Sequence, residues 1–170
     1  MSGQRVFVAL ICAALVLPSI GAGQDLRTQA TPGQTKVDIS IALKVAGQPY
    51  NFSGKARSTH APVASIYGTN AQQWQVEHNE DGRSVSLTFW RPTAGSGDMF
   101  TLRCKINGKS YLVRTVKTSG GGTIQGSGKV TFTPSKPGGT FTIDATTADG
   151  LTITGTIKCS AFSAPVDEGG

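Results

Sequence analysis

Residues 126–164 read GSGKVTFTPSKPGGTFTIDATTADGLTITGTIKCSAFSA, and this stretch decides the fold. Apolar and polar residues alternate along it in three short runs, with Gly or Pro at each joint. Period-two alternation between such joints is typical of antiparallel strands with one buried face. The stretch therefore predicts a β meander. The alternating apolar residues are Val130, Phe132, Phe141, Ile143, Ala145, Leu151, Ile153, Ile157 and Cys159.

The same alternation extends upstream to about Thr35, and no window between these points has the 3.6-residue period of a helix. The sequence predicts an all-β fold, a single antiparallel meander domain of about nine strands over residues 35–164. A β-sandwich and an up-and-down barrel both fit this pattern. The choice stays open, because only hairpin pairings can be read from the sequence.

Turn residues predict how the hairpins pair. Asn107-Gly108 is the strongest short hairpin signal and predicts a two-residue turn. Four-residue connections are predicted at 46–49 and 79–82, and a glycine-rich linker at 118–128. The predicted cross-strand pairs are Leu43 with Phe52, Val76 with Val85, Trp74 with Leu87, Leu102 with Val113, Cys104 with Tyr111, Phe132 with Phe141, and Phe141 with Ile157.

The amino terminus has the pattern of a secretory signal peptide at residues 1–23: a short basic start, an apolar run and a small-residue end. The apolar run is 12 residues long, shorter than the roughly 20 that a spanning helix needs. A buried amino-terminal helix is the alternative. We expect a secreted or periplasmic protein without a membrane span in the mature chain, with a flexible leader at 24–34 and a disordered tail at 165–170.

Two cysteines remain once the signal peptide is removed, Cys104 and Cys159, and both fall on predicted inward positions. An even pair in an exported chain is most often a disulfide, since the export compartment is oxidising. The sequence therefore predicts a Cys104–Cys159 bridge, which would also bring Lys158 near the middle hairpin. Two separate buried thiols are the alternative.

Charge favours anionic partners without selecting one. Removal of the signal peptide takes away Arg5 and leaves 15 basic against 10 acidic residues. The middle hairpin presents Arg103, Lys105 and Arg114 outward, with Lys117 just beyond, so this face is a candidate binding surface for an anionic glycan or an envelope surface. A solvated charged face or a protected edge strand is the alternative. Aromatic residues for base stacking are few, so no specific nucleic acid is expected.

Residues 58–72, STHAPVASIYGTNAQ, form the longest stretch without strand alternation. Loops of this length in compact domains are often functional, which makes His60, Ser65, Tyr67 and Asn70 candidate binding residues. The alternative is a covering segment with one helical turn that buries Ile66 and Tyr67.

Enzyme chemistry has little support in the sequence. His60 and His78 are the only histidines, and neither sits in a nucleophile-elbow motif. No metal site or cofactor is predicted, because convergent ligands at suitable spacing are lacking.

The closing segments GGTFTIDA and GTIKC give the last third of the chain a pattern that resembles small exported bacterial β proteins, a likeness that transfers no functional residue. We expect a non-enzymatic envelope interaction or ligand-binding module. A small hydrolase or metal-dependent enzyme using His60 or His78 is the alternative.

Overall fold

The computed structural model describes residues 35–165, which form ten β-strands and no helix. The all-β prediction is confirmed, with one strand more than the expected nine. Within these residues there is no helix long and apolar enough to cross a membrane. The strands are β1 (Lys36–Val45), β2 (Gln48–Ile66), β3 (Thr69–Glu80), β4 (Arg83–Pro92), β5 (Met99–Ile106), β6 (Lys109–Thr118), β7 (Gly121–Gln125), β8 (Ser127–Ser135), β9 (Gly138–Thr146) and β10 (Thr152–Cys159).

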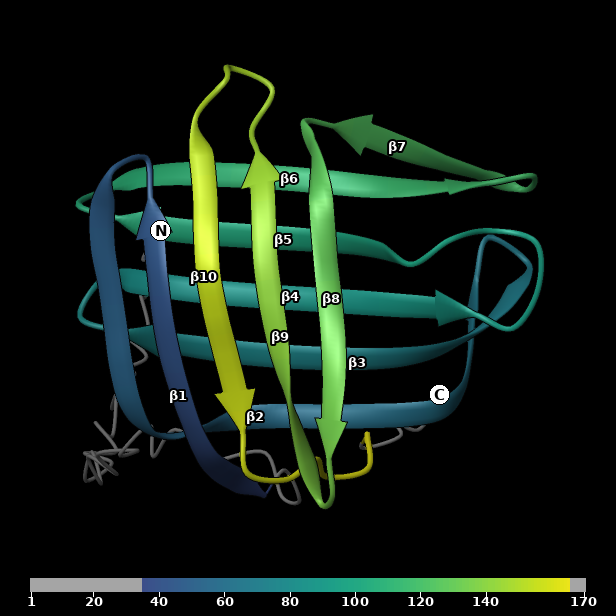
Figure 1. The fold of residues 1–170 in the computed structure, drawn as a ribbon, viewed down its shortest axis with the longest axis horizontal. Helices are drawn as coiled ribbons and strands as arrows, with labels where there is room; N and C mark the ends of the chain where they lie inside the picture. The colour runs from purple at the N-terminus through teal and green to yellow at the C-terminus, as the bar shows by residue number, and fades with distance from the viewer. Residues whose placement is uncertain (1–34, 166–170) are drawn as a thin grey trace, which may run out of the picture. The chain divides into compact units, whose positions relative to one another are not determined.

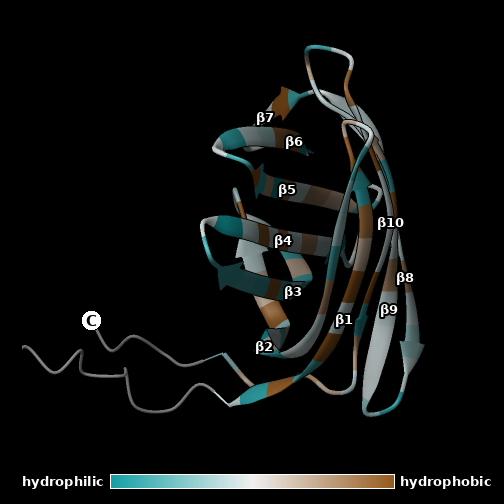
Figure 2. Cartoon of the chain, turned by 90° about the vertical axis from the view of Figure 1, so that its left-hand side faces the viewer, coloured by the Kyte–Doolittle hydropathy of each residue, from teal (hydrophilic) through white to brown (hydrophobic). Residues whose placement is uncertain are grey.

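All ten strands belong to one antiparallel sheet in the order β7-β6-β5-β4-β3-β2-β1-β10-β9-β8. The first strand pairs with the last, from Ile39 opposite Cys159 to Val45 opposite Ile153. The free edges are therefore β7 and β8, two strands that are consecutive in the chain. The sheet curls into a half-barrel whose two halves face each other and cross at a steep angle (Figures 1 and 2).

Strand β2 belongs to both halves of the sheet. Its first part pairs with β1 and its second part with β3, and Arg57 has a partner on both sides, Lys36 and Glu77. Beyond Arg57 the strand bends away from β1 (Figure 1). We call β1, the start of β2 and β8–β10 the first layer, and the rest of β2 with β3–β7 the second layer.

Four hairpins share one kind of two-residue turn, a non-glycine residue followed by glycine. Both residues have left-handed backbone, with φ of 47–51° at the first position and 72–82° at the glycine. This is the type I′ geometry, whose twist matches that of the flanking strands. The turns are Ala46-Gly47, Tyr67-Gly68, Asp81-Gly82 and Asn107-Gly108.

These turns correct two of the predicted registers. Leu43 lies opposite Tyr50 rather than Phe52, and Val76 lies opposite Leu87 rather than Val85. The predicted Trp74–Leu87 pair is likewise wrong. A slip of two residues keeps every side chain on its own face, so the apolar pattern could not detect it. The other predicted pairs are confirmed, namely Leu102 with Val113, Cys104 with Tyr111, Phe132 with Phe141, and Phe141 with Ile157.

Two segments predicted to be irregular are strands. Residues 58–72 complete β2, make the Tyr67-Gly68 turn and begin β3, and the glycine-rich linker contains β7. The predicted loop is therefore wrong, and so is its alternative with a helical turn. Ile66 is buried as that alternative required, but Tyr67 is 53% exposed. The alternation was hidden because the register shifts between Ala61 and Ala64, around Pro62.

Aromatic rings fill the space between the two layers. Phe89 comes from the second layer, and Phe132 and Phe141 come from the first. Their ring centroids lie 4.7–6.4 Å apart. Phe162, just after β10, packs against both Phe132 and Phe141. The described interior is thus a packed core, and the hollows that could hold a ligand lie on the surface.

The predicted disulfide is wrong, because both cysteines are free. Each thiol is buried, as predicted, but Cys104 lies on β5 in the second layer and Cys159 ends β10 in the first. Both side chains point inward, but they start from different layers, and inward positions on two layers need not be adjacent. Burial raises the pKa of Cys104 to about 12 and that of Cys159 to about 11, so both thiols stay protonated and unreactive at neutral pH. Lys158 points outward from β10 and does not join the middle hairpin.

The predicted signal peptide at 1–23 and leader at 24–34 lie outside the described residues, as does the tail beyond residue 165.

The aromatic core gives a first prediction. Phe141 is fully buried, and Phe141→Ala should lower the free energy of unfolding by about 3–5 kcal/mol, because it removes a ring that contacts Phe89, Phe132 and Phe162. Urea denaturation measures the change. The neighbouring exposed change Thr142→Ala should stay within about 0.5 kcal/mol. Equal losses in the two variants would contradict this description of the core.

Candidate functional site

The tip of the β2–β3 hairpin lies over the outer face of the second layer. Proline has no N–H for the sheet ladder, and the register shift around Pro62 leaves Val63 86% exposed. Beyond this bulge the Tyr67-Gly68 turn reaches the turn between β6 and β7. There the backbone of Tyr67 lies against Gly120 and its ring lies 3.5 Å from the Cβ position of Gly121. A side chain at Gly120 would overlap the Tyr67 carbonyl oxygen.

A small hydrophobic cluster holds this tip in place. Met99 and Val116 lie on the outer face of β5 and β6, and they form a buried cluster with Ile66 and Ala71 from the hairpin. Trp90 of β4 packs against the same cluster, and its indole nitrogen donates a hydrogen bond to Gln73 at 3.3 Å. The tip is therefore anchored by apolar burial on a face that is otherwise mostly polar.

A hollow of about 320 Å³ lies beneath the anchored tip, and we call it the hairpin-tip pocket. Its size falls within the range of small-molecule sites. It combines two aromatic rings, three hydroxyl groups and one guanidinium group with an apolar floor. The lining residues are Ser65, Ile66, Tyr67, Trp90, Thr101, Arg114 and Val116.

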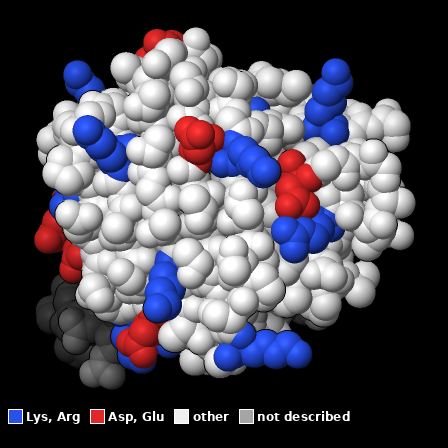
Figure 3. Space-filling view, in the orientation of Figure 1, with Lys and Arg blue, Asp and Glu red and all other residues white. Residues whose placement is uncertain are grey.

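Arg114 has no acidic partner among residues 35–165. Its cross-strand neighbours are Thr101 and Gln125, both uncharged. The other face of the molecule differs: on the outer face of the first layer, acidic and basic side chains lie next to one another (Figure 3), and Lys129 is paired in register with Asp144. An uncompensated guanidinium group beside aromatic rings is suited to hold an anion.

The structure brings together three of the eight predicted binding residues. Ser65, Tyr67 and Arg114 line the hairpin-tip pocket, although they come from the two separate regions that the sequence proposed. Asn70 pairs with Ser65 across the turn, and its carbonyl oxygen accepts hydrogen bonds from the backbone and hydroxyl group of Thr93. The other predicted residues do not line this pocket: His60, Arg103, Lys105 and Lys117.

Four residues of the pocket were not predicted as site residues, namely Ile66, Trp90, Thr101 and Val116. The Asn107-Gly108 turn places Thr101 opposite Arg114, and the period-two alternation places Trp90 on the outer face. The sequence therefore held enough information to add Thr101 and Trp90 to the candidate site residues. No sequence signal places the tip of a distant hairpin over them.

His78 lies in the wedge where β2 and β3 separate, and both of its ring nitrogens have partners. Tyr50 contacts Nδ1 at 2.6 Å, Glu80 lies 3.5 Å from Nε2, and the ring stacks on Phe52 at 3.6 Å. Tyr50 is 1% exposed and burial raises its pKa to about 12, so its hydroxyl group stays protonated and donates to Nδ1. Burial lowers the pKa of His78 and so favours the neutral imidazole, although the Glu80 carboxylate acts in the opposite direction. Both ring nitrogens are engaged, so neither is left for a substrate.

His60 stacks on Trp74 with ring centroids 4.4 Å apart, and its Nε2 is buried without a partner among the described residues. Burial lowers its pKa, an effect that a hydrogen bond to Gln72 partly offsets. Phe162 covers the same region, and Ser163 is hydrogen-bonded to the backbone on either side of Thr59. His60 is therefore part of the packing under the carboxyl-terminal segment.

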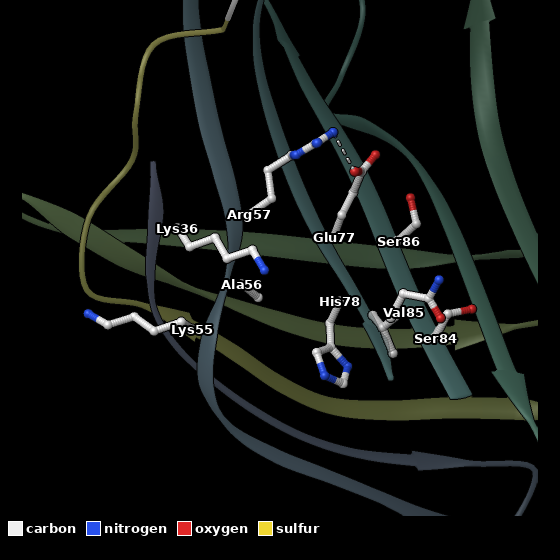
Figure 4. A pocket seen from close by; sticks show the side chains of 10 residues that line it. Lys36, Lys55, Ala56, Arg57, Glu77, His78, Ser84, Val85 and Ser86 are labelled. Carbon is white, nitrogen blue, oxygen red and sulfur yellow. Dashed lines mark hydrogen bonds and ion pairs between the residues drawn. The ribbon is translucent and has the colours of Figure 1, made fainter. Parts of the chain in front are cut away.

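A second hollow, of about 390 Å³, lies at the corner where β2 passes from one layer to the other. We call it the corner hollow (Figure 4). Its charged side chains are Lys36, Lys55, Arg57 and Glu77, and Arg57 is paired with Glu77 at 3.1 Å. Ser84 and Ser86 of β4 form its other side. In residues 35–165 no group of three His, Cys, Asp or Glu side chains is placed to hold a metal ion.

Comparison of the chain with family models, curated proteins and solved structures gives no match.

The hairpin tip gives a second prediction. Gly120→Ala should destabilise the protein by about 1–3 kcal/mol and displace the tip, because the new methyl group meets a backbone carbonyl that cannot rotate away. The measurement is urea denaturation together with Trp90 fluorescence. Gly97→Ala is the matched control, since an added Cβ there has no neighbour within 4 Å. A Gly120→Ala variant as stable as the control would show that the two turns do not pack together.

The histidines give a third prediction. Burial lowers the pKa of both His60 and His78 in the folded state, so the unfolded chain, with pKa near 6.5, takes up protons first as the pH falls. Stability should thus be full well above about pH 6.5 and decrease as the pH falls below this value toward the lower pKa values of the folded state. Urea denaturation at several pH values measures this dependence.

The His78→Asn variant should be less stable at neutral pH but should show a smaller loss on acidification. His60→Gln is the companion variant, and it should keep the loss of stability on acidification that is due to His78. If the stability of His78→Asn depended on pH as strongly as that of the wild type, His78 would not be a source of the pH dependence.

Proposed function

We propose that the protein is a non-enzymatic ligand-binding module that works in the periplasm or outside the cell, and that the hairpin-tip pocket binds an acidic sugar. The observation that carries this proposal is the guanidinium group of Arg114, which has no acidic partner within residues 35–165 and lies in a hollow with Trp90 and Tyr67. The signal-peptide pattern at residues 1–23 supports the compartment.

The residue types in the pocket fit a carboxylate-bearing sugar. A guanidinium group binds a carboxylate through two parallel hydrogen bonds. The faces of Trp90 and Tyr67 can pack against the apolar C–H face of a sugar ring, while the hydroxyl groups of Ser65 and Thr101 can exchange hydrogen bonds with its hydroxyls. Trp90 is held by Gln73, so little side-chain freedom is lost on binding.

The alternative, an enzyme that uses His60 or His78, has weaker support. Neither histidine lines the hairpin-tip pocket. His78 lines the corner hollow, but its two nitrogens are engaged by Tyr50 and Glu80, so a general base there would first have to break one of these contacts.

The proposal is tested by titrating the full mature protein with galacturonate and, for comparison, with uncharged galactose, while following tryptophan fluorescence. Galacturonate should cause a saturable change and bind about tenfold more tightly than galactose, because only the acid can pair with Arg114. Arg114→Gln should reduce the affinity for galacturonate by about tenfold or more.

Lys117→Gln is the matched control, since it removes one charge from the same strand outside the pocket. Trp90→Phe should remove most of the fluorescence change, because Trp74 is buried. An affinity for galacturonate that is the same in Arg114→Gln and wild type would refute the proposal.

A further inference from the structure

The hairpin-tip pocket and the corner hollow open on the same face of the second layer. A row of cross-strand neighbours joins them: Arg57 on β2, Glu77 on β3, Ser86 on β4 and Arg103 on β5. Arg103 lies two residues along β5 from Thr101, which is the partner of Arg114. The outer face is therefore one continuous surface from Arg114 to Arg57.

The surface between the hollows carries exposed cations that have no acidic cross-strand partner. Arg103 lies between Ser86 and Leu112, and Lys105 lies between Ser84 and Ser110. Neither cation has an ion pair within the part of the chain that the structure describes. Glu77, already bound to Arg57, is the one carboxylate in the row.

Two like charges lie in register at the end of this path. Lys36 and Arg57 are direct cross-strand partners at the rim of the corner hollow, and like charges in such positions destabilise a sheet. Only Arg57 has an acidic partner among the described residues. An anionic group bound in the corner hollow would offset the repulsion between the two side chains.

The spacing fits a chain with repeated negative charges. Diagonal neighbours such as Arg114 and Arg103 lie about 7–8 Å apart on a sheet, and Arg103 and Lys105 lie about 7 Å apart along their strand. From Arg103 to Lys36 there are four strand steps, about 19 Å in all. A monosaccharide cannot span this distance, but an oligosaccharide can.

The neighbours of these cations favour a sugar chain over a nucleic acid. Apart from Leu112 beside Arg103, they are hydroxyl and amide side chains, which suit sugar hydroxyls, and include Ser84, Ser86, Ser110 and Gln125. Single-stranded nucleic acid is usually held by successive aromatic platforms. Along this path the aromatic side chains, Tyr67 and Trp90, are confined to the hairpin-tip pocket.

We propose that the outer face of the second layer is an extended binding track for an acidic polysaccharide. One acidic sugar sits in the hairpin-tip pocket, and the chain continues over Arg103 and Lys105 toward the corner hollow. This inference rests on the proposed function, since the pocket is the first subsite of the track.

The test compares galacturonate with an octamer of α-1,4-linked galacturonate by calorimetry on the full mature protein. The octamer should bind at least about tenfold more tightly than the monomer, because further subsites engage at high effective concentration. The gain should shrink as salt is added. The double variant Arg103→Gln/Lys105→Gln should lose about fivefold in octamer affinity and keep the monomer affinity.

The matched control is Lys44→Gln/Lys129→Gln, which removes the same charge from the outer face of the first layer. It should leave octamer binding unchanged. Equal losses in both double variants, or no octamer gain while the monomer still binds, would overturn the track and leave the pocket standing. An oligothymidylate that binds more tightly than the octamer would overturn the sugar assignment. If neither the monomer nor the octamer binds, both proposals fail.

Discussion

The fold depends on one strand, β2, that hydrogen-bonds to a different neighbour in each of its halves. At Arg57 the pairing passes from β1 to β3, so the strand must bend and the single sheet becomes two facing layers. The wedge opened by this change is filled by Tyr50, Phe52 and His78. The corner hollow lies at the same bend, so its position follows directly from the topology.

A packed interior places the candidate chemistry on the outside. Inward side chains of each strand pack in the core and stabilise the fold, so they cannot contact a ligand. A ligand must then be recognised by outward residues and by segments that fold over them. The β2–β3 hairpin does this through its bulge, its buried Ile66 and its contact with Gly120. A glycine is needed there because two backbones approach more closely than a side chain allows.

Burial keeps the interior polar groups of this protein in their neutral forms. The thiols of Cys104 and Cys159, the Tyr50 hydroxyl group and the imidazole of His78 all have pKa values shifted by burial in the direction that disfavours charge. The charged side chains are instead outward, and they include the arginines and lysines of the second layer that have no ion pair among the described residues.

The sequence by itself determined the strands outside residues 58–72 and 121–125, their inward faces, and the registers of the Asn107-Gly108 hairpin and the closing meander, because period-two alternation and turn residues are local signals. It also made Arg114, Ser65 and Tyr67 candidates, but in two unrelated groups. Only the tertiary structure decided that β1 pairs with β10, that the cysteines lie apart on facing layers, and that the hairpin tip covers Arg114 and Trp90. Each of these depends on how the sheet bends at Arg57 and around Pro62, and such long-range geometry leaves no periodic trace in the sequence.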